Sequence, residues 1–244
     1  MYRKHYSFIV LLFLVSGILS CAKPNGSLKY NKVEGDKSGG HTQAAQEEMS
    51  TQESLPIHLA VGSFDPLIKA SPVALPRYLT IQAYPEGEVG YYILQFRGPV
   101  LQQWKEELVA AGVVIFDYIP QFAFLVKMDH QTLRSVEAMD SVRWVGIYQP
   151  GYRIAPDLMS KPEEKENQSI ELLVSIFKGE DISFLRSRLE LLGGENIEVA
   201  PGGEKVKLTL SCKMLAELAL LPGVKYIERV PEFKLSPTNS IGGE

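Results

Sequence analysis

The chain has few of the residues from which catalytic and metal centres are usually built. Its 244 residues include two cysteines, Cys21 and Cys212, and four histidines, His5, His41, His58 and His130. No group of these residues has the spacing of a metal site. There is also no phosphate-binding loop and no Gly-x-Ser-x-Gly nucleophile motif. The sequence therefore predicts neither a metal nor an organic cofactor.

Basic runs are missing as well. Lysine and arginine together number 25 against 29 aspartate and glutamate residues, which gives a formal net charge of -4. Proteins that bind nucleic acids generally carry a basic patch or stripe that neutralises phosphates. We therefore expect no nucleic acid among the partners of this chain.

The apolar run near the N-terminus, from Phe8 to Val15, is too short to cross a bilayer. It follows the basic residues Arg3 and Lys4, and together they indicate a secretory signal peptide over residues 1–20. The end of this segment, Ile18-Leu19-Ser20-Cys21, resembles a bacterial lipobox. The resemblance implies cleavage before Cys21, lipidation of its thiol, and an exported lipoprotein anchored to a membrane of the cell envelope. The alternative is an ordinary signal peptide followed by an incidental cysteine.

Cys212 would then be the only remaining thiol, so we expect no internal disulfide. It follows Ser211, a residue type that often begins a helix. A helix N-terminus can lower the pKa of a thiol, which would favour a reactive role. The other interpretation is that Cys212 has only a structural role.

The stretch after the signal differs from the rest of the chain. Residues 21–54 are rich in Gly, Ser, Gln and Glu and cannot bury much apolar surface, so we expect a disordered tether. The alternation at Ile57–Val61 predicts a short strand, and we interpret residues 55–90 as an ordered arm packed on the domain that begins at Tyr91. His58 and Asp65 could form a catalytic pair, but this combination is common by chance.

From Tyr91 to Pro156 the chain carries a pattern that it then repeats. Tyr92, Phe96 and Leu108 match Leu173, Phe177 and Leu189 at an offset of about 81 residues. The offset becomes about 82 from Val126, which matches Leu208, to Trp144, which matches Tyr226. A register that shifts by one residue in a loop is typical of a duplicated domain.

Each copy has the pattern of six secondary-structure elements. In the first we expect strands over 91–97, 113–118, 122–128 and 142–147, a helix over 100–111 closed by Gly112, and a second helix capped by Asp129. The order βαββαβ is that of a ferredoxin-like unit. The second copy follows over 171–230, with Ser211 as the matching cap. The predicted fold class is thus α+β, with two tandem ferredoxin-like domains and antiparallel sheets, over residues 55–158 and 170–244, joined by a linker over 159–169.

A ferredoxin-like sheet buries one face under its helices and leaves the other open. In the second copy, alternation places Val206, Leu208 and Leu210 toward the helices and Lys205, Lys207 and Thr209 on the open face. In the first copy the open face is predicted to be apolar, with Ile93, Ala123, Leu125, Val145 and Ile147. Such a face is usually covered. The cover could be residues 55–90, the other repeat, or a partner protein.

Several of these strands carry a resemblance. Tyr92–Phe96, Phe122–Val126, Val142–Val145 and Val224–Glu228 resemble strands of the propeptide or inhibitor domain of subtilisin-like serine peptidases. The similarity extends over about residues 55–237 and is closest to the duplicated N-terminal region of large exported bacterial peptidases of this class. Two features depart from the family: the domain is double, and the chain stops at Glu244, about where a peptidase would begin.

The resemblance implies a module that binds a subtilisin-like serine peptidase, in cis or from a neighbouring gene, as folding assistant, inhibitor or both. In the family the sheet packs on helices of the peptidase, and the tail after the last strand lies in the substrate cleft. The tail residues here are Val230, Pro231, Glu232, Phe233, Lys234 and Leu235. Tyr152–Ala155 is the equivalent segment of the first copy, held in mid-chain.

Catalysis is not expected of this chain. A subtilisin-like peptidase brings together Asp, His and Ser, and the usual neighbourhoods Asp-Ser/Thr-Gly, His-Gly-Thr and Gly-Thr-Ser are all missing. Two alternatives to the peptidase-binding module stay open. One is a structural or surface-binding lipoprotein that uses the same fold, and the other is the truncated N-terminal part of a full peptidase.

Overall fold

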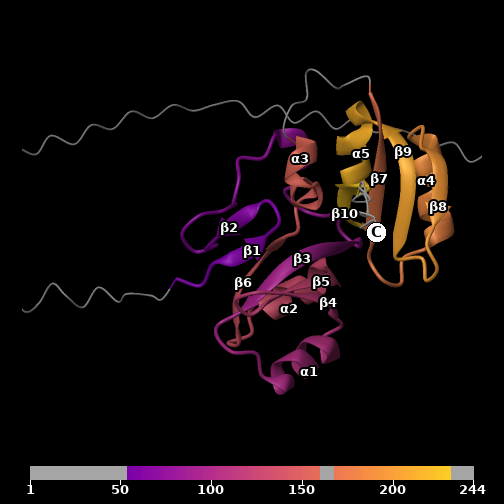
Figure 1. Ribbon diagram of the computed structural model, residues 1–244. Coiled ribbons are helices and arrows are strands. Elements are labelled where there is room, and N and C mark those ends of the chain that lie inside the picture. Colours follow the sequence, from indigo (N-terminus) through magenta and orange to yellow (C-terminus); the bar gives the residue numbers. More distant parts are fainter. Residues whose placement is uncertain (1–53, 160–167, 232–244) are drawn as a thin grey trace, which may run out of the picture. The chain divides into compact units, whose positions relative to one another are not determined.

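The structure is a computed structural model that describes residues 54–159 and 168–231 (Figure 1). All of these residues belong to one unit that begins at Gln52. The predicted signal peptide, the lipidation site Cys21, residues 21–53 of the tether, residues 160–167 of the linker and the tail from Glu232 onward lie outside the described residues.

The first copy folds in the predicted order βαββαβ. Its elements are β3 (Val89–Phe96), α1 (Gln102–Ala110), β4 (Val114–Ile119), β5 (Ala123–Asp129), α2 (His130–Glu137) and β6 (Val142–Ile147). The strands form one antiparallel sheet in the order β4-β5-β3-β6. The strands that follow the two helices, β4 and β6, therefore lie at the edges, and β3 and β5 lie at the centre.

The second copy has the same topology. Its elements are β7 (Ser169–Ile176), α4 (Ile182–Leu191), β8 (Glu195–Val199), β9 (Lys205–Ser211), α5 (Leu215–Leu220) and β10 (Val224–Arg229). The antiparallel order β10-β7-β9-β8 is the order of the first sheet read from its opposite edge, with β7 and β9 in the central places. The fold is therefore α+β with two tandem ferredoxin-like domains, as the repeat predicts.

Local signals explain where the helices begin and end. The Asp129 carboxylate accepts a hydrogen bond of 2.7 Å from the backbone N–H of Thr132, which confirms it as the cap of α2. Gly112 closes α1 at a φ of 96°, and Gly193 closes α4 at 82°, in the left-handed region that favours glycine. Ser211 stands before a 3-10 turn, Cys212–Met214, rather than directly before α5.

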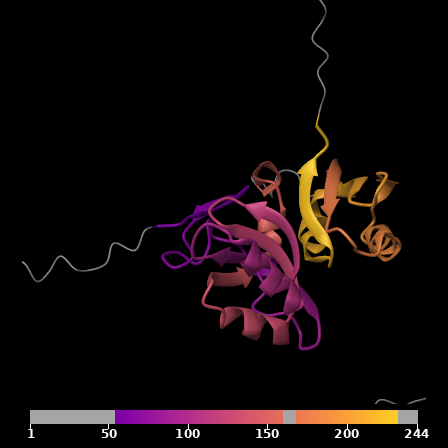
Figure 2. The same ribbon diagram turned by 90° about the horizontal axis from the view of Figure 1, so that it is seen from below.

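In both copies the helices cover one face of the sheet, as Figures 1 and 2 show. In the first copy Leu108 and Val136 pack against Tyr92, Leu94 and Phe96. In the second, Leu185, Leu189 and Leu218 pack on the sheet. The sheet residues of that second core include Val206, Leu208 and Leu210, as alternation predicts.

The register of the repeat differs by one residue from the sequence prediction in the first strand. Leu172 faces Leu208 as Tyr92 faces Val126, so Tyr92 corresponds to Leu172 at an offset of 172 − 92 = 80. Phe177 is therefore the counterpart of Arg97 and not of Phe96. The backbone agrees, because the N–H of Arg97 donates to Ser141 and that of Phe177 to Gly223, both just before the last strand. Ile176 takes the place of Phe96 in the helix-side core.

A second correction concerns Val145 and Ile147. They pack on the helix side of the first sheet rather than on its open face. The reason is a β-bulge, where the pairing of β3 with β6 shifts between Gln95 and Phe96 and skips Arg143. The extra residue reverses the alternation along β6, so Trp144 lies on the open face instead.

The arm that precedes the first copy is ordered, as predicted. It forms a hairpin of β1 (Ile57–Leu59) and β2 (Gly62–Phe64), followed by a 3-10 turn at Arg77–Leu79. Ile57 and Phe64 pack on the open face of the first sheet together with Ile93, Ala123 and Leu125. The predicted apolar face is thus covered within the chain.

Two short elements connect the copies. After β6 come a 3-10 turn, Pro150–Arg153, and α3, Pro156–Met159. Between them Ile154 forms a parallel bridge with Ile227 of β10, and the N–H of Ala155 donates to the Ile227 carbonyl at 2.9 Å. The connection therefore pairs with the outer edge of β10.

Candidate functional site

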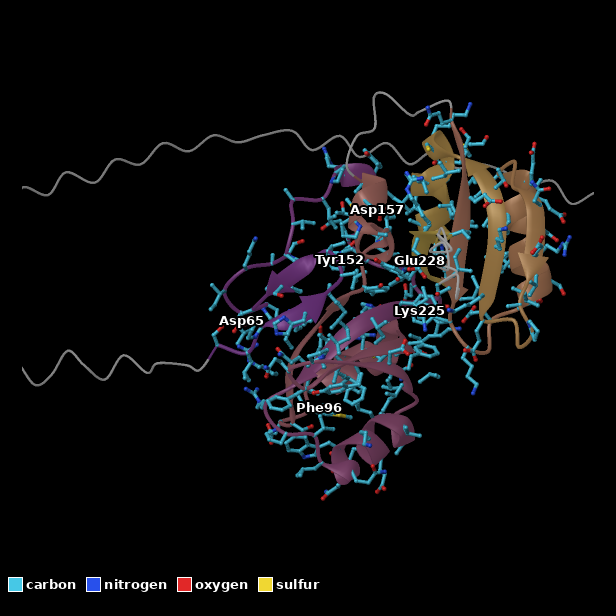
Figure 3. The ribbon with its side chains drawn as sticks, in the orientation of Figure 1. Asp65, Phe96, Tyr152, Asp157, Lys225 and Glu228 are labelled. Carbon is cyan, nitrogen blue, oxygen red and sulfur yellow. The ribbon has the colours of Figure 1, made fainter. Side chains whose placement is uncertain are left out.

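The open face of the second sheet is a candidate docking surface. Alternation along β9 directs Lys205, Lys207 and Thr209 to it, opposite Ser175, Leu173 and Glu171 of β7. On the other side of β7, Tyr226 and Glu228 of β10 stand opposite Ser175 and Leu173. Figure 3 labels Lys225 and Glu228 on β10. Most of these side chains are half-buried or exposed.

The chemistry of this face is mixed. Lys207 lies 3.4 Å from Glu171, with 39% and 58% of the two side chains exposed, so the ion pair is largely solvated and weak. Leu173 and Tyr226 supply apolar and aromatic surface between the charges. The combination of charged, apolar and aromatic side chains is typical of a polar protein interface.

The predicted tail leaves the sheet at the end of β10. The N–H of Val230 still donates to the Glu171 carbonyl at 3.2 Å. Pro231 follows and is exposed. The other predicted contact residues, Glu232, Phe233, Lys234 and Leu235, lie outside the described residues. Only the root of the tail is therefore visible, at an edge of the second sheet.

The corresponding segment of the first copy is fully enclosed. Tyr152, Arg153, Ile154 and Ala155 are all buried. The Tyr152 hydroxyl lies 3.0 Å from the Ser71 hydroxyl in the arm, and its ring packs near Phe64. This segment is therefore used inside the fold, which agrees with the prediction that it is held in mid-chain.

A buried polar network holds the arm on the first sheet. Arg143, the bulged residue of β6, donates to both carboxylate oxygens of Asp65 at 2.8 and 2.9 Å, and to the side-chain oxygen of Gln95 at 2.7 Å. The amide nitrogen of Gln95 donates in turn to the Leu55 carbonyl at 2.9 Å. We call Asp65, Arg143 and Gln95 the arm latch; Asp65 is labelled in Figure 3.

The arm latch controls the ionisation of Asp65. Burial acts to raise the pKa of this carboxyl. Hydrogen bonds from Arg143 and from the backbone N–H groups of Leu55 and Leu67 outweigh that effect, so the pKa lies below its ordinary value of 3.8. Asp65 is therefore an ionised partner of Arg143 and not half of a catalytic pair. His58 makes a separate contact, with its Nδ1 2.7 Å from the Ser63 hydroxyl.

The junction between the copies is built around Phe177 and Arg153. Phe177 is 1% exposed and stacks on Tyr91 with ring centroids 4.1 Å apart. The buried guanidinium of Arg153 donates to the carbonyls of Ala219 and Leu221 at the end of α5, at 3.2 and 3.4 Å. It also lies over the rings of Tyr91 and Tyr148, at 5.5 and 5.6 Å from their centroids.

Tyrosine ionisation at this junction is suppressed. Burial, together with a hydrogen bond to Glu180, raises the pKa of Tyr91 far above its ordinary value. Burial has the same effect on the pKa of Tyr148, whose hydroxyl donates to the Lys225 carbonyl at 3.1 Å. The phenols are therefore neutral packing and hydrogen-bonding groups, which excludes them as bases near neutral pH.

Residues that could carry chemistry are scattered over the described part of the chain. Cys212 is a free thiol, half-buried against the second core. Within residues 54–159 and 168–231, no group of three His, Cys, Asp or Glu residues could hold a metal ion. In the same ranges, no helix is long and apolar enough to span a membrane.

Sequence patterns alone do not reveal three of the structurally important residues. Arg143 lies in a β-bulge, which the hydrophobic pattern of the sequence does not indicate. Arg153 stands out only as part of the segment equivalent to the tail. Phe177 matches Phe96 as an aromatic residue, although its neighbour Ile176 fits that core position equally well by hydrophobicity.

Comparisons with known proteins do not assign a function to the chain. Residues 58–149 match the family model described as "Domain of unknown function (DUF8729)", which covers the arm and most of the first copy. No curated protein sequence matches the chain significantly.

Two solved structures resemble the chain weakly. The acetolactate synthase small subunit from Thermotoga maritima is 17% identical, with a TM-score of 0.20, over 58% of this chain and 92% of that protein. A conserved bacterial protein from Streptococcus pneumoniae is 14% identical, with a TM-score of 0.23, over 58% of this chain and 93% of its own.

Proposed function

We propose that this chain is a non-catalytic module that binds a subtilisin-like serine peptidase, as a folding assistant, an inhibitor or both. The observation that carries the proposal is the difference between the two open sheet faces. The first is closed by Ile57 and Phe64 of the arm and by Phe177. The second carries charged and aromatic side chains that remain accessible in the described residues.

The tail supports the same assignment. Its root at Val230 and Pro231 emerges directly from β10, a strand that belongs to the proposed docking face. Pro231 and Pro237 remove backbone donors and disfavour the interior of a sheet. An extended segment that carries Phe233 and Leu235 can add as a strand to a peptidase cleft through main-chain hydrogen bonds. The open face of the second sheet and the tail after β10 would then bind the peptidase together.

We further propose that the protein is an exported lipoprotein, tethered to a membrane of the cell envelope through lipid on Cys21. The lipobox-like residues before Cys21 support this. Stable anchoring takes more than one acyl chain, and a processed lipoprotein carries several. Replacing Cys21 by Ala should release the protein from the membrane fraction. Retention of that variant after a salt and carbonate wash would contradict the anchor.

Two other functions compete with this proposal. The same fold could serve a structural or surface-binding lipoprotein, since a fold does not by itself fix a function. The chain could also be the N-terminal part of a longer peptidase, in which case the same docking face would act in cis. An adjacent or in-frame sequence with the Asp, His and Ser motifs would favour peptidase binding over the structural role.

The test compares three proteins for inhibition and refolding of a subtilisin-like peptidase from the same cell. They are the full chain, a chain that ends at Val230, and a full chain with Lys207→Glu and Tyr226→Ala. Loss of inhibition in the second protein and weaker binding in the third are expected. A matched control is Lys105→Glu in α1 of the first copy, outside the proposed docking face, which should have no effect. Equal activity of all these proteins would overturn the proposal.

A further inference from the structure

We propose that the outer edge of β6 is a second binding site, which takes an extended peptide segment of a partner protein as an added strand. The segment would have apolar side chains at alternate positions and a neutral or basic character. This site lies in the first copy and does not depend on the proposed peptidase contact.

The hydrogen-bond pattern of β6 leaves two residues facing outward. The N–H of Tyr148 donates to Tyr91, its direct opposite. In an antiparallel ladder, hydrogen-bonded and non-bonded pairs alternate. Gly146 therefore bonds to Ile93, whereas Val145 and Ile147 direct their N–H and C=O groups away from β3, toward the sheet edge. In the described part of the chain, nothing pairs with these four groups.

A cavity opens beside this edge. It has a volume of about 660 Å³ and is lined by Val145, Gly146 and Ile147 of β6, by Leu133 and Glu137 of α2, and by arm residues within the ranges 70–75 and 80–84. Its size falls in the range of ligand sites. The side chains of Val145 and Ile147 are on the helix side of the sheet, so an added strand would place alternate side chains in the same cavity.

The arm passes this edge without closing it. The side chain of Gln149 accepts from the N–H of Ile81 at 2.8 Å and donates to its carbonyl at 3.1 Å. A side chain thus satisfies the arm backbone, and the arm does not pair with Val145 or Ile147. The space between arm and edge is the opening that a further strand would fill.

The other sheet edges are paired or carry charged side chains, whereas the outer edge of β6 beyond its bulge is neither charged nor paired within the described residues. The connection through Ile154 pairs with β10. The edge strand β8 carries Glu195 and Glu198, and β4 has a bulge and contacts Lys225 through Asp117. Charges and bulges are the usual means by which edges avoid pairing. Beyond its bulge, β6 presents only Val145, Gly146 and Ile147, which carry no charge.

The charge of the side chains that line the cavity determines which class of peptide segment would bind. Among the residues that line the cavity, Glu137 is the one carboxylate and His130 the one basic side chain, and neither lysine nor arginine occurs. The burial of Tyr92 and its nearness to Tyr84 and Glu137 raise the pKa of its phenol to about 12, so that group is neutral and adds no negative charge. An acidic segment would therefore be disfavoured, and a basic or neutral one is expected.

The first experiment uses the full chain and a fluorescein-labelled hexapeptide of alternating lysine and valine. Saturable binding is expected, with the largest amide chemical-shift changes at Val145 and Ile147. Two further peptides are methylated at alternate backbone nitrogens, one at the odd and one at the even positions. One of the two should bind at least tenfold more weakly, because its methylated nitrogens are those that would face β6. The corresponding glutamate–valine peptide should bind at least tenfold more weakly.

Variants of the chain complete the test. Ile147→Pro removes an outward N–H without breaking a bond to β3 and should weaken binding at least tenfold. Its matched control is Val199→Pro on the edge of β8, where the Ala200–Lys205 hydrogen bond indicates that the Val199 N–H also faces outward. That control should bind the peptide normally. Glu137→Lys should reduce the preference for the basic peptide over the acidic one.

Several results would overturn the proposal. These are the lack of any binding, chemical-shift changes elsewhere, and affinity that is insensitive to nitrogen methylation. If Ile147→Pro fails to fold, the methylated peptides still decide the question. A chain that ends at Val230 and binds the peptide more tightly than the full chain would show that the tail occupies the edge, and a partner segment would then be the wrong occupant.

Discussion

The central strands β3 and β7 occupy the same place in the two copies, yet they are buried differently. In β3 every residue after Val89 is buried, including Gln95. In β7 buried residues alternate with exposed or half-buried ones. A strand that is covered on both faces reads as a continuous apolar run, whereas one that is covered on one face alternates. The first sheet is therefore covered on both faces, whereas the described residues leave one face of the second sheet accessible.

The counterparts Arg97 and Phe177 show the same division at a single position. Arg97 is exposed and donates from its side chain to the Asp140 carbonyl at 2.7 Å. Phe177 is buried among Tyr91, Phe116 and Tyr148, whose ring centroids lie 4.1, 4.7 and 6.4 Å away. One position is thus a surface residue in one copy and the apolar anchor of the junction in the other.

The largest expected effect comes from breaking the arm latch. Asp65→Ala leaves the buried Arg143 without its charge partner, and removing one member of a buried ion pair costs about 4 kcal/mol. Urea denaturation of the variant and of the unchanged chain gives this difference in the free energy of unfolding. The matched control in the second copy is Glu171→Ala, which breaks an exposed pair and should cost less than about 1 kcal/mol.

The same latch predicts how stability depends on acid. The folded pKa of Asp65 lies below its ordinary value of 3.8. Its contribution is therefore present above that value and is lost as pH falls below it, because the unfolded state then binds the proton first. Urea titrations between neutral pH and pH 3 should show a smaller loss of stability in Asp65→Ala than in the unchanged chain. Parallel curves for both proteins would mean that the latch is not the titrating element.

The next effect concerns the junction. Phe177→Ala removes a fully buried aromatic ring and should lower the free energy of unfolding by about 3 kcal/mol. Arg97→Ala at the corresponding position should cost well under 1 kcal/mol. Because Phe177 joins the copies, we also expect the variant to unfold in two separable transitions. Tryptophan fluorescence would follow only the first copy, which holds Trp104 and Trp144, and far-UV circular dichroism would follow both. A single transition of unchanged midpoint would contradict the role of Phe177.

The smallest effect should be the same in both copies. Gly112→Ala and Gly193→Ala each place a side chain in a left-handed backbone conformation, at φ of 96° and 82°. Each should cost about 1 kcal/mol. Unequal losses, measured by thermal unfolding of the two variants side by side, would mean that the helix ends differ more than their geometry indicates.

The sequence predicted the fold well where periodicity decides, and less well where one residue changes the phase. The βαββαβ order, the Asp129 cap and the glycine closures follow from local signals. The bulge at Arg143 could not be found, because an extra residue in a strand leaves no mark in hydrophobicity and yet moves Val145 and Ile147 to the other face. The same holds for Phe177, where an aromatic match favoured the wrong register.

The candidate surfaces divide in a similar way. The charged face of the second sheet follows from the alternation of Lys205, Lys207 and Thr209. The cover of the first face was predicted as one of three possibilities, and the arm and Phe177 both contribute to it. The arm latch and the open edge of β6 depend on contacts between segments far apart in the chain, which no local pattern encodes.

The hydrogen bonds of Leu55 have a mechanical consequence. At this residue the chain enters the fold, with its N–H held by Asp65 at 2.9 Å and its carbonyl by Gln95 at 2.9 Å. A force applied to the N-terminal segment would act on these two hydrogen bonds and on the β1–β2 hairpin before it acted on either four-stranded sheet. We therefore expect tension to peel the hairpin away first and uncover Ile93, Ala123 and Leu125 while both sheets are still intact.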